Sequence, residues 1–284
     1  MTALSMNPLA KHFRQPAIYL QLPSGGKYWP DGSIDLPLNG QIPVYPMTTR
    51  DEISIRTPDA LLNGESVVGV IKSCCPAITN PWKMPSIDVD AVLIAIRIAS
   101  YGQAMDIDTI CPSTACKHQN THSLDLTSVL DGIRAPNYDV PVEVQDLKIK
   151  IKPQSYFEGY KNNNLNFEEQ RLMQIINDQD MSEEDKLKKY GEHMQRLVDI
   201  NLTILASGTE YIETSDGTRV NDFNFIKEFY DNADNKIIKS VRGRFDKINE
   251  GMALPRPRVQ CSECEFEYPV EIEFDYTRFF NNAS

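Results

Sequence analysis

Hydrophobic and polar residues alternate with a period of two near both ends of the chain. Residues 18–22 alternate in this way, and a turn of one proline, one serine and two glycines follows at 23–26. Residues 258–261 and 268–274 carry a similar pattern on either side of a short turn. A period of two is typical of half-buried strands, and Gly, Pro and Ser between such segments favour hairpins. We therefore expect β-hairpins near both ends of the chain.

Hydrophobic residues recur with a helical period in much of the remaining chain. Ser86 begins a segment whose body, residues 91–99, is apolar almost all round, and Gly102 ends it. A helix without a polar face must be buried on most sides, so Arg97, its one charge, is expected to pair with a carboxylate. Other helices are expected from Thr57 to about Cys74 and from Ser182 to about Ala206. Further strands are expected over residues 34–36, 42–45, 105–110, 123–126 and 142–151.

Runs of strands, then helices, then a final hairpin indicate an α+β fold. Its β-hairpins lie at the N-terminus and at two cysteine turns, as in a zinc ribbon, and its middle region is mainly helical. The predicted organisation is a flexible arm over 1–16, an α/β domain over 17–156 with the first cysteine hairpin, a mainly helical region over 157–250, and a C-terminal cysteine hairpin and tail over 251–284 that packs back on 17–156.

The charge balance narrows the choice of partners. The net charge of -11 repels phosphate backbones, which disfavours non-specific nucleic-acid binding. Between Asp231 and Arg258, however, basic residues outnumber acidic ones. This stretch is either a solvated helix face or a docking face for an acidic partner protein.

The expected cellular compartment decides how the six cysteines are interpreted. The N-terminus lacks an apolar core of signal-peptide length, and the longest apolar run, Ala91–Ile96, is too short to span a bilayer. We therefore expect a protein made in a reducing cytosol. There, cysteines serve as thiols or metal ligands more often than as disulfides.

Four cysteines form two pairs at predicted hairpin tips. Cys111 and Cys116 are separated by four residues, and Cys261 and Cys264 by two. Two such turns facing each other make a tetrahedral four-sulfur site, which suits a structural zinc ion. His118 or His122 could replace one sulfur, and idle thiols or a disulfide are the alternatives. The adjacent Cys74 and Cys75 are expected to be core thiols.

No recognised catalytic motif is present. The sequence contains no G-x-G-x-x-G, no phosphate loop, no G-x-S-x-G and no H-E-x-x-H. A zinc ion with four protein ligands keeps no open position for water. We therefore expect a protein that is not an enzyme and has no small-molecule substrate.

Several stretches together resemble one known family. They are residues 22–28 (Leu-Pro-Ser-Gly-Gly-Lys-Tyr), 47–52, 57–64 and 94–102, and an ending with 273–275 followed by Phe279-Phe280. The chain resembles the baseplate hub proteins of T-even-type contractile-tailed bacteriophages over 22–102 and, in pattern, over its last thirty or so residues. The four-residue gap between Cys111 and Cys116 departs from the two-residue gap expected.

The resemblance implies a structural or assembly role in the virion, at the tail baseplate, after synthesis in the host cytoplasm. Its expected partners are other baseplate or tail proteins, with no nucleic acid and no membrane. Two alternatives remain open: a zinc-ribbon protein that binds nucleic acid or acts in transcription, and a transient assembly chaperone. Phe279 and Phe280 are expected to lie either at a protein interface or in the core.

Overall fold

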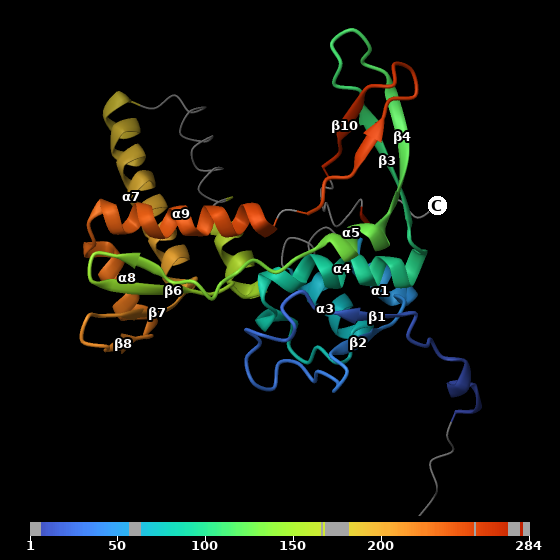
Figure 1. The fold of residues 1–284 in the computed structure, drawn as a ribbon, viewed down its shortest axis with the longest axis horizontal. Helices are drawn as coiled ribbons and strands as arrows, with labels where there is room; N and C mark the ends of the chain where they lie inside the picture. Colours follow the sequence, from blue (N-terminus) through green and yellow to red (C-terminus); the bar gives the residue numbers. More distant parts are fainter. Residues whose placement is uncertain are drawn as a thin grey trace, which may run out of the picture. The chain divides into compact units, whose positions relative to one another are not determined.

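The structure, a computed structural model, has the expected α+β architecture of helices and small antiparallel sheets (Figure 1). It describes residues 7–56, 64–165, 167, 182–252, 254–271 and 279–280. The predicted helix start at Thr57 lies outside these residues. The chain divides into two compact units: unit 1 comprises Met1–Pro81, Asp88–Ile133 and Leu254–Ser284, and unit 2 comprises Trp82–Ile87 and Arg134–Ala253.

The core of unit 1 is built around helix α4, Ser86–Tyr101. Its residues 91–96 are completely buried, as the unbroken apolar run requires. The other elements of this part are the antiparallel strands β1 (Ile18–Gln21) and β2 (Gln41–Val44), and the helices α1 (Thr49–Ile55) and α3 (Glu65–Cys74).

The strand predicted at residues 34–36 is wrong. These residues lie in a loop, where the N–H of Asp35 donates to the carbonyl of Ala77 and not to a neighbouring strand. The carbonyl of Ala77 thus accepts the hydrogen bond from Asp35 that a neighbouring strand would accept in a sheet.

The glycine-containing turn that follows β1 is fixed by a buried carboxylate of α4. Asp88 accepts hydrogen bonds from the Ser24 N–H at 2.8 Å, the Ser24 Oγ at 2.6 Å and the Trp29 Nε1 at 2.7 Å. Burial raises the pKa of Asp88, and these three donors oppose that rise. Gly26 has φ of +83°, and a Cβ there would come within 2.7 Å of Leu36. The hydrogen bonds to Asp88 and the close contact of Gly26 with Leu36 therefore explain the conformation of this turn.

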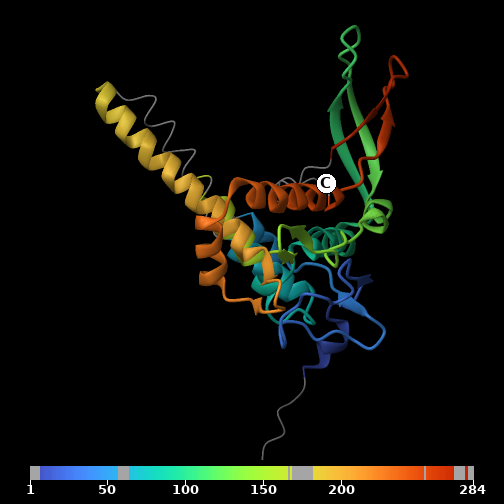
Figure 2. The same ribbon diagram turned by 60° about the vertical axis from the view of Figure 1, so that its left-hand side comes forward.

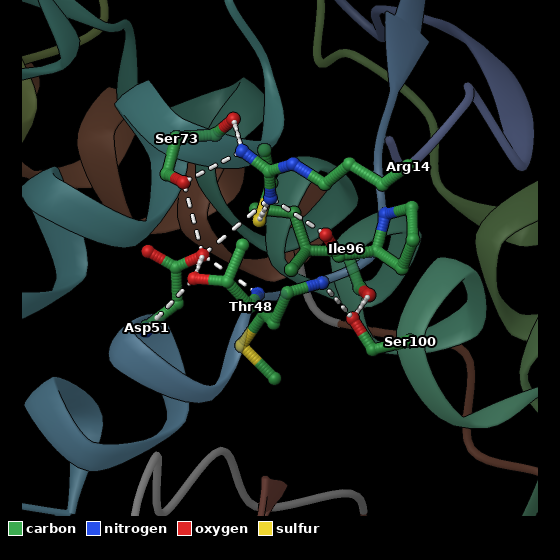
Figure 3. A network of polar contacts seen from close by, with 9 residues as sticks. Arg14, Thr48, Asp51, Ser73, Ile96 and Ser100 are labelled. Carbon is green, nitrogen blue, oxygen red and sulfur yellow. Dashed lines mark hydrogen bonds and ion pairs between the residues drawn. The ribbon is translucent and has the colours of Figure 1, made fainter. Parts of the chain in front are cut away.

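A second polar network joins the N-terminal segment to α1 and α3 (Figure 3). Arg14 donates to the carbonyls of Pro46 and Ser73, both at 2.7 Å. The Ser73 hydroxyl and the Thr48 N–H both donate to Asp51, which completes a capping box at the start of α1. Arg14, which the sequence assigned to a flexible arm, is thus held in place.

Unit 1 continues into two antiparallel hairpins. The first pairs β3 (Ala104–Ile110) with β4 (Gln119–Asp125), and the second pairs β9 (Arg258–Gln260) with β10 (Glu267–Pro269). Helix α5, Leu126–Gly132, follows the first hairpin. Its last residue, Gly132, lies so close to Pro255 that a Cβ there would come within 2.5 Å of the proline ring.

Unit 2 contains a four-stranded antiparallel sheet and several helices. The sheet order is β5 (Val142–Val144), β6 (Leu147–Ile151), β7 (Thr209–Glu213) and β8 (Arg219–Val220). Residues 156–165 are helical, and the other described helices include α7 (Glu183–Ser207), α8 (Phe223–Asn232) and α9 (Asn235–Met252). Figure 2 shows α8 beside the C-terminal half of α7.

The single strand predicted over 142–151 is a hairpin. Gln145 adopts φ of +54°, which reverses the chain between β5 and β6. No glycine or asparagine occurs in this turn, and Asp146 is its one residue of a type that favours turns. By contrast, the predicted helix start at Ser182 is confirmed, since its side chain accepts from the Asp185 N–H. Gly217 adopts φ of +85° in the turn between β7 and β8.

Of the two alternatives left open for the paired phenylalanines near the C-terminus, the core is the position observed. Phe279 is 3% exposed and Phe280 is 1% exposed. The Phe279 ring lies 5.4 Å from the guanidinium of Arg97, which also faces Tyr101 at 5.6 Å.

The carboxylate partner expected for Arg97 is not found among the residues that the structure describes. The side chain is 1% exposed, and its Nε and Nη1 have no hydrogen-bond acceptor. The faces of the Tyr101 and Phe279 rings lie against the guanidinium instead. In the described part of the chain, no helix is long and apolar enough to cross a membrane.

Candidate metal centre

The two cysteine hairpins of unit 1 meet at their tips, as the sequence predicts. The Sγ atoms of Cys111, Cys116, Cys261 and Cys264 all lie within 4.8 Å of one another. Two of the distances are 3.7 Å, between Cys111 and Cys264, and 3.8 Å, between Cys116 and Cys261. The four sulfurs are therefore close enough to bind one metal ion.

These distances fit a shared cation better than a covalent bridge. A disulfide requires sulfurs about 2.05 Å apart. Four thiolates placed tetrahedrally about 2.3 Å from one ion lie about 3.8 Å from each other. The observed separations agree with the second arrangement.

Each tip has the same local construction. The first cysteine of each hairpin is tied across its turn: the Cys111 N–H donates to His118 O at 2.9 Å, and the Cys261 N–H donates to Phe266 O at 3.0 Å. The residue after the second cysteine is left-handed in both, with φ of +54° at Lys117 and +58° at Glu265. This conformation turns the backbone N–H groups of the tip toward the sulfurs.

The side chain of Asn120 joins the two hairpins. Its Oδ1 accepts from both the N–H and the Oγ of Ser262 at 2.9 Å. Its Nδ2 donates to the Cys261 sulfur at 3.5 Å and to the Tyr268 hydroxyl at 3.4 Å. Tyr268 is in turn bonded to Thr109 at 2.7 Å. Sequence reasoning missed Asn120, since an asparagine in a strand carries no signal that it faces a sulfur on a distant hairpin.

The electrostatic environment differs among the four thiols. Burial opposes a charge on Cys261, but the N–H groups of Cys264 and Glu263 and the amide of Asn120 together lower its pKa to about 6. The N–H of His118 favours the thiolate of Cys116, yet desolvation and the neighbouring sulfurs raise its pKa to about 12. Burial likewise raises the pKa of Cys111. The Cys261 thiolate therefore forms readily, whereas Cys111 and Cys116 need a nearby cation to ionise.

Neither histidine belongs to the cluster. His118 contributes its carbonyl to the turn and is exposed, whereas the His122 ring lies 3.2 Å from the Tyr268 hydroxyl. Among the described residues, the potential ligands at this site are four sulfurs. The predicted core thiols Cys74 and Cys75 are fully buried, and burial raises the pKa of Cys74 to about 12.

A comparison with protein families supplies an independent observation. The family described as T4 bacteriophage base plate protein matches residues 16–281, which is most of the chain. The chain belongs to this base plate protein family. A search of curated proteins and a search of solved structures found no match.

Membership in this family indicates the role of the protein and its place in the virion. Proteins of this base plate family are structural parts of the phage tail, so a role in the virion tail follows, and other tail proteins are the partners that such a role implies. The resemblance based on the N-terminal motifs is confirmed. Two of these motifs, around Ser24 and around Thr48, make the buried contacts with Asp88 and Asp51 described above.

Proposed function

We propose that this base plate protein is a component of the baseplate hub of a contractile tail, that it acts through protein–protein contacts, and that a structural zinc ion stabilises it. The ligands are Cys111, Cys116, Cys261 and Cys264. We propose a structural role for the protein and no catalytic activity. The observation that carries the metal part is the four-sulfur cluster at the tips of two hairpins.

The chemistry of the donors supports zinc. A set of four sulfurs selects soft or borderline cations and disfavours calcium and magnesium, which prefer oxygen. Zinc accepts tetrahedral geometry without preference from its d electrons and undergoes no redox change. When bound, the ion would supply positive charge that lets all four thiols ionise. Because four protein atoms would fill its coordination shell, no position remains for a reacting water.

The position of the cluster in the sequence supports a clamping role. Cys116 lies on the first hairpin and Cys261 on the second, and all of Arg134–Ala253 separates them. A metal bound to both hairpins would hold the C-terminal segment onto the middle of the chain. Structural zinc in small domains contributes on the order of 10 kcal/mol of apparent binding free energy, so even a fraction of this would fix the hairpins.

Two measurements test the proposal separately. Elemental analysis of protein purified without chelator is expected to find about one zinc per chain; absence of metal, or iron in its place, would refute the zinc site. Mass spectrometry of purified phage particles is expected to detect the chain in intact tails and in isolated hubs. Detection only in assembly intermediates would identify a transient chaperone instead.

A further inference from the structure

Helix α9 carries a row of exposed basic side chains on the face that points away from the core of unit 2. Ile237, Val241 and Ile248 bury one side of the helix. Lys236, Lys239 and Arg242 are exposed and follow one another at intervals of three residues. We call these three residues the α9 basic surface. They belong to the basic stretch for which the sequence left two interpretations open.

Some cations of unit 2 are paired with carboxylates, such as Lys227 with Asp199 at 2.7 Å and Arg219 with Glu213 at 2.5 Å. Among the described residues, no carboxylate lies within ion-pair distance of Lys239 or Arg242, whereas Lys236 lies near Asp234, whose pKa it helps to lower. A row of exposed cations on a protein with a net charge of -11 concentrates positive potential where most of the surface repels anions.

A cavity of about 310 Å³ begins at the end of this surface. Arg242 and Lys152 both line it, so two cations border the same space. Ile204, Leu205 and Phe245 provide apolar walls, and the rest of the lining comprises Ser86, Tyr138, Pro153, Gln154, Asn201, Asp246 and Asn249. A concave, partly apolar site with a few polar groups is typical of a site that takes a side chain or small ligand.

We propose that the α9 basic surface and the adjoining cavity bind an acidic segment of another base plate protein. One carboxylate of that segment lies between Lys152 and Arg242, an apolar side chain rests on Phe245, and further acidic residues lie along Lys239 and Lys236. This inference rests on the proposed role in protein–protein contacts and names the chemistry of one partner.

Charge and shape favour a protein segment over nucleic acid. Three or four phosphate contacts would give only weak, salt-sensitive binding, and the acidic remainder of the protein would oppose it. The apolar walls of the cavity make no favourable contact with a phosphate, but they can pack against an aliphatic or aromatic side chain next to a carboxylate.

The test uses the full-length protein with its metal and a fluorescein-labelled peptide that alternates glutamate with leucine and phenylalanine. We expect saturable binding, measured by fluorescence anisotropy, that the double substitution Lys239→Glu with Arg242→Glu weakens at least tenfold. A peptide with glutamine in place of glutamate should bind at least tenfold more weakly than the acidic one. A duplex DNA of equal charge serves as the competing probe.

The matched control is Lys27→Glu with Lys188→Glu, which changes the net charge equally at two exposed sites. Lys188 is thirteen positions before the cavity residue Asn201, or roughly 20 Å along α7 at about 1.5 Å per residue. Both double variants should keep an unchanged circular dichroism spectrum and metal content. Equal weakening by both would reduce the effect to net charge and overturn the proposal, as would preferential binding of DNA.

Incorporation into phage particles separates this inference from the proposed function. If the wild-type chain enters tails but the Lys239→Glu, Arg242→Glu variant does not, the surface binds a tail partner. If the variant enters tails as readily as the wild type, the proposed surface is wrong while the base plate role stands. If the wild type itself is absent from tails, the hub proposal fails, and the peptide measurement still decides whether the surface binds acidic segments.

Discussion

Asn120 is the single side chain whose removal should loosen the two cysteine hairpins most directly. It is 5% exposed, and its amide contacts both hairpins. Substitution by alanine removes both bonds to Ser262 and the bond to the Cys261 sulfur. Each lost hydrogen bond costs about 0.5–1.5 kcal/mol. We therefore expect Asn120→Ala to destabilise the paired hairpins by about 2–4 kcal/mol.

Because the chain has two units, a local measurement is needed. The amide of Cys261, bonded to Phe266 O at 3.0 Å, reports opening of the second hairpin. Its hydrogen-exchange protection in the metal-loaded protein should fall by roughly 30- to 700-fold, which corresponds to the same free-energy range at about 1.4 kcal/mol per tenfold. Amides of α8 in unit 2 should keep their protection.

The neighbouring position provides the control. Gln119 is exposed on the same strand, and Gln119→Ala should change protection by less than about 0.5 kcal/mol. If Asn120→Ala has no larger effect than Gln119→Ala, the amide does not join the hairpins and the reasoning fails. Asn120→Asp adds a useful contrast. It keeps an acceptor for Ser262 but replaces the donor to the Cys261 sulfur with a negative charge, so it should bind metal more weakly than the wild type.

Three further predictions concern other parts of the chain. Burial raises the pKa of Asp90 from 3.8 to about 6, so its charged form destabilises the fold above that pH; Asp90→Asn should stabilise the protein by up to about 3 kcal/mol in urea unfolding at pH 7.5 and make no difference below pH 4. Phe280→Ala should cost about 3–5 kcal/mol because the ring is 1% exposed, and an unchanged melting temperature would contradict its place in the core. Removing the metal with a chelator should expose residues 254–271 to limited proteolysis while leaving α7 and α8 resistant; equal cleavage throughout would contradict a local clamp.

Patterns that depend on neighbouring residues could be predicted from the sequence. The buried helix α4 follows from an apolar run that has no polar face, and its end follows from Gly102, which has φ of +88°. The cysteine pairs predicted a four-sulfur cluster because thiols at two tight turns have few other uses in a reducing compartment.

Features that depend on distant residues could not be predicted. Among the described residues, Arg97 faces aromatic rings and no carboxylate, and one of these rings belongs to Phe279, almost two hundred positions away. Asn120 gains its role only when Ser262 arrives from the other hairpin. The hairpin at Gln145 was missed because a left-handed glutamine has no distinctive sequence signal. In each case tertiary contacts determine the conformation or the partner of the residue.

The contact between Gly132 and Pro255 has an evolutionary consequence. The chain leaves unit 1 after Ile133 and returns at Leu254. Gly132 and Pro255, which flank the intervening segment, lie in close contact. A gene segment inserted at such a point adds a new module without stretching the host domain, because the two ends of the insertion need no separation. A change in the length of the 134–253 segment would therefore leave the two ends of unit 1 and the register of its cysteine hairpins unaltered.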